Sequence, residues 1–264
     1  HGAYSISSFD IDNDADNDLI STAENDNEIS WWENTGLKNF TEHTITSTFD
    51  DATFSFPSDI DNDNDIDLIV ASINGNKISY WENDGFQNFT ERVIITGYRG
   101  AHSGFPIDLD GDMDVDLVAA SLSGTIDWFE NDGYQNFNRH TEGTDFSIAV
   151  DARAADIDGD QDIDLVGVAQ GAEKISWFEN DGNQKFSEHI ITSNFRGSRC
   201  YMIDIDDDGD SDIIGSSHYL GEISLWLVEK SSSKSTSNGS PGWPASIIVL
   251  ALVLRLIIKK YFLV

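Results

Sequence analysis

The chain has 264 residues, of which 48 are Asp or Glu and 15 are Lys or Arg, and its formal net charge is −33. This charge excludes nucleic acid as a partner, because phosphate binding needs a basic face, and it favours cations as ligands. Hydrophobic residues make up 39% of the chain and aromatic residues 11%, too many for a disordered acidic polymer. The single cysteine, Cys200, excludes a disulfide scaffold, and we expect it to be a buried free thiol.

The acidic residues follow a repeat. Aspartate occupies every second position in five runs of nine residues, and the first members of successive runs are 48 or 49 residues apart. The runs are Asp10, Asp12, Asp14, Asp16 and Asp18; Asp59, Asp61, Asp63, Asp65 and Asp67; Asp108, Asp110, Asp112, Asp114 and Asp116; Asp156, Asp158, Asp160, Asp162 and Asp164; and Asp204, Asp206, Asp208, Asp210 and Asp212. The charge is therefore concentrated in five predicted loops.

A second motif repeats in step with the loops. Its copies read ISWWENTG, ISYWENDG, IDWFENDG, ISWFENDG and ISLWLVEK, starting at Ile29, Ile78, Ile126, Ile175 and Ile223. Asn-Asp-Gly indicates a tight turn, because Asn and Gly adopt positive φ at low cost. The fifth copy lacks these turn residues. A Phe-led segment follows each of the first four copies, as in FTEHTI from Phe40.

Each unit therefore predicts four short strands, with the Asp loop between the first and the second. Four-stranded units of about 40–50 residues, repeated, are typical of β-propeller blades. We expect an all-β propeller with five blades, at about 1–48, 49–97, 98–146, 147–194 and 195–230. The last blade is predicted to be incomplete, because the chain turns polar after Lys230 where a fourth strand would follow.

The segment DIDGDQDIDLV from Asp156, followed by ISWFENDG, resembles the FG-GAP/VCBS repeat family, a group that includes the propellers of integrin α-subunits. The resemblance extends over 1–230. It implies a propeller of usually seven blades, with calcium in the loops between first and second strands, on secreted or surface proteins. Because only five copies are present, we expect a fragment of a larger, about seven-bladed ring, whose missing blades precede His1.

The same resemblance implies the ligands. Loop positions one, three, five and nine would supply side-chain oxygens, and position seven its backbone carbonyl. In the fourth loop the side-chain ligands would be Asp156, Asp158, Asp160 and Asp164, with Asp162 facing solvent or binding through water. We expect about five Ca²⁺ with a structural role, because calcium takes six to eight oxygen ligands. Positions four and six usually hold Gly, whereas most copies here hold other residues.

The aromatic residues of the third strand fall in two adjacent registers. Trp31 and Trp128 share one register, and Trp32, Trp81 and Trp226 share the next. Adjacent strand residues face opposite ways. We therefore expect one register to pack between blades and the other to form a partly exposed aromatic row, which could bind sugars.

The C-terminal part differs in composition from the repeats. A Ser-rich linker with a Pro-Gly motif, 231–244, precedes a predicted helix, 245–264, whose apolar stretch 245–258 is interrupted by Arg255 and followed by Lys259 and Lys260. Such a segment is long enough to cross a bilayer as a helix, with the lysines cytoplasmic and the propeller outside. The order of these features resembles the C-terminal sorting signals of archaeal and bacterial surface proteins.

These features predict a non-catalytic calcium-binding propeller on the extracellular face of the cell membrane. It would mediate adhesion or bind a surface protein or a glycan. Two alternatives stay open: the accessory propeller of a larger extracellular enzyme whose catalytic domain lies outside this sequence, and a lectin. His102, Arg153 and Arg199 break the repeat, and individual function arises at such positions, although surface variation is the simpler interpretation of each. No catalytic residues are predicted.

Overall fold

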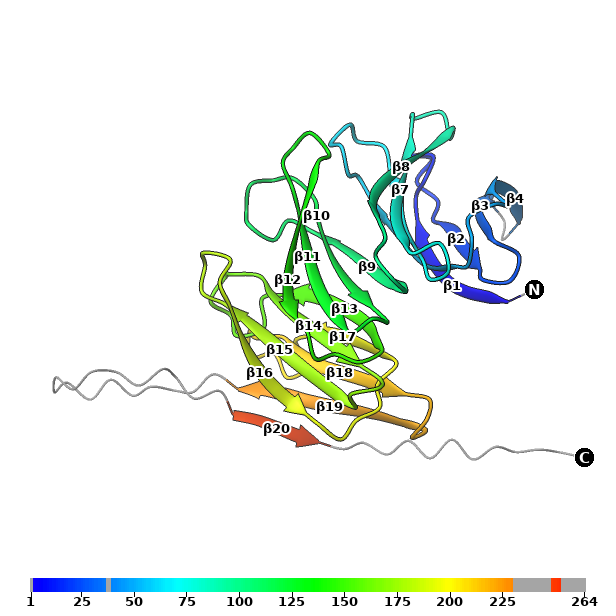
Figure 1. Ribbon diagram of the computed structural model, residues 1–264. Coiled ribbons are helices and arrows are strands. Elements are labelled where there is room, and N and C mark those ends of the chain that lie inside the picture. The colour runs from blue at the N-terminus through cyan, green and yellow to red at the C-terminus, as the bar shows by residue number, and fades with distance from the viewer. Residues whose placement is uncertain (1, 37–38, 230–247, 253–264) are drawn as a thin grey trace, which may run out of the picture.

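The computed structural model describes residues 2–36, 39–229 and 248–252. These residues form five antiparallel sheets of four strands each, arranged side by side along an arc (Figure 1). In each sheet the strands follow one another in chain order, from the inner strand of the arc to the outer strand. The molecule is therefore the all-β, five-bladed propeller that the repeat predicts.

The strand bounds repeat as closely as the sequence does. Blade 1 contains β1 (Ala3–Phe9), β2 (Asp18–Ala23), β3 (Glu28–Asn34) and β4 (Phe40–Thr46). Blade 2 contains β5 (Ala52–Ser58), β6 (Asp67–Ser72), β7 (Lys77–Asn83) and β8 (Phe89–Thr96). Blade 3 contains β9 (Ala101–Ile107), β10 (Asp116–Ser121), β11 (Thr125–Asn131) and β12 (Phe137–Gly143). Blade 4 contains β13 (Ala149–Ala155), β14 (Asp164–Ala169), β15 (Lys174–Asn180) and β16 (Phe186–Thr192). Blade 5 contains β17 (Arg199–Ile203), β18 (Asp212–Ser217), β19 (Glu222–Glu229) and β20 (Ile248–Leu252).

The hydrophobic core consists of four clusters, each between two neighbouring blades. Each cluster includes one aromatic residue from the segment that links the two blades, namely Phe49, Tyr98, Phe146 or Phe195. All four are at most 3% exposed. Second strands such as β6 and β14 are buried along their whole length, because a neighbouring blade covers each of their faces. This explains their continuous apolar sequences.

Both aromatic registers of the third strand are buried in most blades, so the predicted exposed row is wrong for all blades but the first. In the first register Trp31, Trp128 and Trp177 are 6%, 4% and 2% exposed. In the second register Trp81 and Trp226 are 8% and 5% exposed, and only Trp32 of blade 1 is half-buried. The physical reason is that the second register packs against the preceding blade, which covers it in blades 2–5, whereas the prediction treated each strand as half-exposed.

The recurring histidines of the fourth strand cover the first register. His43, His140 and His189 stack on Trp31, Trp128 and Trp177, with ring centroids 4.5–4.8 Å apart. The Nε2 atom of each histidine lies 2.7–2.9 Å from a carboxylate oxygen of Glu33, Glu130 or Glu179. Their spacing thus belongs to the repeated architecture. Asn39 and Asn88, which begin Asn-Phe-Thr sequences beside outer strands, are exposed.

The structure of blade 5 contradicts a second prediction, that this blade lacks a fourth strand. Strand β20 pairs antiparallel with β19, from Leu225↔Leu252 to Glu229↔Ile248, so the sheet has a fourth strand where none was expected. Ile, Val and Leu suit a strand as well as a membrane helix, and a short apolar run does not distinguish the two. The rest of the predicted helix lies outside the described residues. Among the described residues no helix is long and apolar enough to cross a membrane.

The two end blades expose apolar side chains that inner blades bury. Ile6 of β1 is 69% exposed and Tyr201 of β17 is 61% exposed, whereas most of β5, β9 and β13 is buried or half-buried. Among the described residues no apolar cluster joins blade 5 to blade 1. The described blades thus form an open arc (Figure 1), and a larger ring stays a prediction.

The linking aromatic residues provide a test of the inter-blade core. Phe146→Ala should lower the free energy of unfolding by about 3–5 kcal/mol, because a fully buried ring leaves a cavity between blades 3 and 4. Urea unfolding at saturating calcium measures this loss. Tyr134→Ala, which truncates an 82% exposed ring, should change the free energy by less than about 0.5 kcal/mol. Equal effects of the two substitutions would contradict the assigned core.

Candidate metal centre

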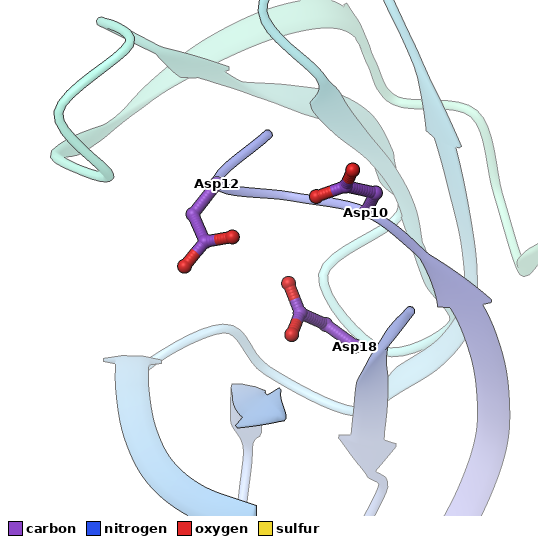
Figure 2. Close-up of side chains that lie close together, drawn as sticks. All are labelled: Asp10, Asp12 and Asp18. Atoms are coloured by element: carbon purple, nitrogen blue, oxygen red, sulfur yellow. The ribbon is translucent and has the colours of Figure 1, made fainter. Parts of the chain in front are cut away.

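Each blade carries a cluster of three carboxylates at the start of its second strand. Carboxylate oxygens of loop positions one, three and nine lie within 4.8 Å of one another in all five loops. Figure 2 shows the first cluster, in which the side chains of Asp10, Asp12 and Asp18 point toward one shared space. Oxygens bound to one calcium ion at about 2.3–2.6 Å can lie no more than about 5 Å apart. The spacing therefore suits a single ion.

The aspartate at loop position nine, which is the last of the five in each loop, connects the loop to the third strand. In blade 4, Asp164 is fully buried. Its Oδ2 accepts a hydrogen bond from the backbone N–H of Ile157 at 3.0 Å, and its Oδ1 accepts one from the backbone N–H of Asn180 at 2.8 Å. The same pair of bonds occurs in the other four blades, although Val228 replaces the asparagine in blade 5.

The first aspartate shapes the tip of the loop. In the fourth loop the carboxylate of Asp156 accepts hydrogen bonds from the backbone N–H groups of Asp160 and Gln161, both at 3.1 Å. Positions four and six have positive φ in every copy, for example 74° at Ala15 and 82° at Gln161. Replacement of the usual Gly thus leaves the backbone path unchanged, although non-Gly residues adopt this conformation at some cost.

Positions five and seven lie outside the three-carboxylate clusters. Asp160 accepts a hydrogen bond from the backbone N–H of Asp162 at 2.9 Å. An added Cβ on Gly182, in the turn after the third strand, would lie 2.7 Å from Oδ2 of Asp162. The turn glycine is therefore required both by its φ of 76° and by this close approach. Metal ligation by positions five and seven stays a prediction.

One residue of the site was interpreted from the sequence only as part of a turn. The asparagine that ends the third strand is buried in blades 2, 3 and 4. In blade 4 the Asn180 side chain donates to the carbonyl of Ile163 at 3.0 Å and accepts from the backbone N–H of Gly182 at 3.2 Å. It therefore ties the metal loop to the turn. The available signal was the Glu-Asn pair, followed by Asp-Gly or Thr-Gly, that accompanies the Asp run in the first four blades.

The buried carboxylates resist ionisation without a cation. Burial raises the pKa of Asp67, Asp116 and Asp164 to about 7, although the backbone hydrogen bonds that each accepts act in the opposite direction. Burial and the neighbouring charge of Asp160 raise the pKa of Asp158 to about 6. In addition, Oδ1 of Asp61 is buried and has no hydrogen-bond partner among the described residues. A bound cation would satisfy this oxygen and favour the charged carboxylates.

The fold and the clusters together define a β-propeller of repeated acidic-loop blades. The FG-GAP-like repeat model matches residues 59–119, 108–167 and 156–215, so the chain belongs to the family of FG-GAP-like repeat proteins. A search of curated proteins finds no match.

Solved structures share the fold. They include a streptogramin B lyase (17% identity, TM-score 0.56), which the chain matches over 85% of its own length and 65% of the lyase. A protein from Lactobacillus plantarum has 10% identity and a TM-score of 0.56, with 88% and 67% covered. The exo-β-1,3-galactanase from Phanerochaete chrysosporium has 12% identity and a TM-score of 0.51, with 81% and 56% covered. The chain thus spans about two thirds or less of these structures.

The buried asparagine gives a test of how the loop is held. Asn180→Ala should weaken metal binding in the fourth loop about tenfold, because it leaves two backbone groups without their partners. Calorimetric titration should then show one weak site beside four unchanged sites. Asn183→Ala, at an exposed position of the same turn, should leave the titration unchanged. Equal effects of both substitutions would contradict the role of Asn180.

The raised pKa values predict that metal binding releases protons. With a pKa of about 7, Asp67, Asp116 and Asp164 each hold about half a proton at pH 7 in the metal-free protein, and a ligating carboxylate must lose it. Calcium titrations in two buffers of different ionisation enthalpy should give different heats at pH 7 and converging heats at pH 9.

The same shifts set a direction for stability. A raised carboxyl pKa means that the folded state binds more protons than the unfolded state between about pH 4 and 7. These three groups therefore destabilise the metal-free protein progressively as the pH rises through that window. For the proton release predicted above, identical heats of calcium titration in the two buffers at pH 7 would contradict the raised pKa values.

Proposed function

We propose that the chain is a non-catalytic, calcium-stabilised propeller that binds a ligand outside the cell. The observation that carries the proposal is the recurrence of one carboxylate cluster in all five blades. A catalytic metal centre is normally unique in its protein, whereas five equivalent clusters suit a structural role. Calcium is the ion that best suits a loop of carboxylates and backbone carbonyls, because it accepts six to eight oxygens in flexible geometry.

Calcium would act on the loop that joins the first and second strands of each blade. In blade 4, Asp156, Asp158 and Asp164 would hold it. The ion would neutralise carboxylates that burial otherwise disfavours and would fix the ninth aspartate against the third strand. Adhesion, or binding of a surface protein or a glycan, would then depend on the surfaces that differ between blades. The likeness to lyase and galactanase structures concerns the fold alone.

The cell surface is part of the same proposal. The apolar residues 245–264 and the basic pair Lys259-Lys260 support a C-terminal anchor with the propeller outside. Residues 248–252 cannot pair with β19 and lie in a membrane helix at the same time. The anchor and the complete fifth blade are thus alternative states of one segment.

Calcium dependence of stability tests the metal part. Modules outside the cell often bind calcium with Kd near 10⁻⁴–10⁻³ M. At tenfold saturation each independent site adds about 1.4 kcal/mol, and five sites add about 7 kcal/mol. The melting temperature of EDTA-treated protein should therefore rise by about 15–25 °C in excess calcium. Magnesium at equal concentration should raise it less. A melting temperature indifferent to millimolar calcium would contradict the proposal.

Truncation tests the anchor. Removal of the residues after Lys230 should move the protein from the membrane fraction to the medium while blades 1–4 stay folded. Arg255→Leu in the full chain, which makes the apolar segment more hydrophobic, should leave the protein in the membrane fraction. Retention of the truncated protein on cells, or a full chain that is uncleaved and soluble without detergent, would contradict anchoring.

A further inference from the structure

The inner strands of all five blades line one pocket of about 510 Å³. We call this the axial pocket; its walls come from β1, β5, β9, β13 and β17. The residue three positions before the first loop aspartate lines the pocket in every blade. In chain order these residues are Ser7, Phe56, Phe105, Arg153 and Tyr201. A single guanidinium thus occupies a register that is otherwise hydroxyl or aromatic.

The guanidinium of Arg153 is surrounded by aromatic rings. Its central carbon lies 5.1 Å from the ring centroids of both Phe54 and Phe105, 5.7 Å from that of Phe56 and 5.6 Å from that of Tyr201. The whole residue is only 6% exposed. Aromatic faces attract a cation but accept none of its hydrogen bonds in the usual geometry. The rings therefore attract the charge without accepting hydrogen bonds from the guanidinium in the usual geometry.

The one carboxylate beside Arg153 is poorly matched to it. Asp151 is fully buried, and its Oδ1 lies 3.4 Å from Nε of Arg153. Both atoms lack a hydrogen-bond partner among the described residues. The other oxygen of Asp151 accepts from the backbone N–H of Cys200 at 3.0 Å. Arg153 and Asp151 thus form an ion pair without a hydrogen bond between them, so this carboxylate is a poor acceptor for the guanidinium.

A second guanidinium adds positive charge. Arg199 lies 5.1 Å from the Phe54 centroid and 5.9 Å from the Tyr4 centroid, and it donates to the carbonyl of Val150 at 3.1 Å. His102 bridges the same region, between the Tyr4 hydroxyl at 2.9 Å and the Val150 carbonyl at 2.6 Å. Burial and the Arg199 charge lower the pKa of His102 to about 4, so it is neutral at pH 7.

We propose that the axial pocket binds a small organic monocarboxylate with an apolar or aromatic body, its carboxylate on Arg153 and Arg199 and its body against the phenylalanine rings. A guanidinium presents planar paired donors that match a carboxylate, and the rings offer apolar contact. The chain's net charge of −33 opposes polyanions. The inference names a ligand class for the proposed binding function and rests on that function.

The test titrates the full, calcium-loaded chain with the probe 3-phenylpropionate and measures binding by calorimetry at pH 7. Saturable binding of one probe per chain is expected, and the neutral 3-phenylpropanamide should bind at least tenfold more weakly. Arg153→Lys keeps the charge but loses the paired donors, and it should weaken binding at least tenfold. Arg199→Gln, at a less buried position, should also weaken it. Arg99→Gln, at an exposed position outside the axial pocket, should not.

Absence of saturable binding, or equal binding of the amide, would overturn the proposal. So would equal binding of inorganic phosphate, because the apolar body would then contribute nothing, or an equal loss in Arg99→Gln. The melting temperature in calcium shows whether each variant is folded. The two measurements also separate the two proposals. If calcium does not stabilise the protein, the melting temperature shows it; if the axial pocket does not bind the carboxylate, only the probe titration shows it.

Discussion

The structure of each blade depends on the carboxylate of the aspartate at loop position nine. In blade 4, Asp164 accepts one backbone hydrogen bond from the loop at Ile157 and one from the end of the third strand at Asn180. One buried side chain at the start of the second strand thus links the loop before it to the end of the third strand. Hydrogen bonds to a charged group are strong, about 1.5–3 kcal/mol each. Burial, however, raises the pKa of this carboxyl to about 7 and so disfavours its charged form.

A bound cation would resolve this conflict inside each blade. The metal clusters connect strands of one sheet, whereas the apolar clusters around Phe49, Tyr98, Phe146 and Phe195 connect one sheet to the next. The two kinds of interaction are therefore complementary: bound ions would fix the shape of each blade, and the aromatic residues pack neighbouring blades together. Loss of one ion should disturb its own blade first, because no carboxylate cluster shares a residue with another.

The sequence predicted the strands and loops that repeat in every blade, and it missed features that depend on contacts with another blade or a distant segment. The spacing of the Asp runs and the Asn-Asp-Gly turns predicted the strands and the five blades. The family resemblance implied side-chain ligands at positions one, three, five and nine, and the structure brings the carboxylates of positions one, three and nine together. The burial of Trp81 and Trp226 could not be read from a single strand, because a second blade supplies the cover. Asn180 was interpreted as a turn residue, since its bond to the metal loop joins segments sixteen or more residues apart. Strand β20 was missed because its apolar residues suit a helix equally well. Arg153 was singled out only as a break in the repeat, and its aromatic surroundings come from three other blades.

The central claim is that each cluster of three aspartates holds one calcium ion. Crystals grown in calcium and measured at a long X-ray wavelength would locate these ions directly through their anomalous scattering. The account predicts one peak in each of the five loops, within bonding distance of the carboxylates at positions one, three and nine, and no such peak at Asp127 or Asp151, which are buried carboxylates outside the loops. Loops without peaks at millimolar calcium, in crystals whose blades are otherwise ordered as described, would contradict it.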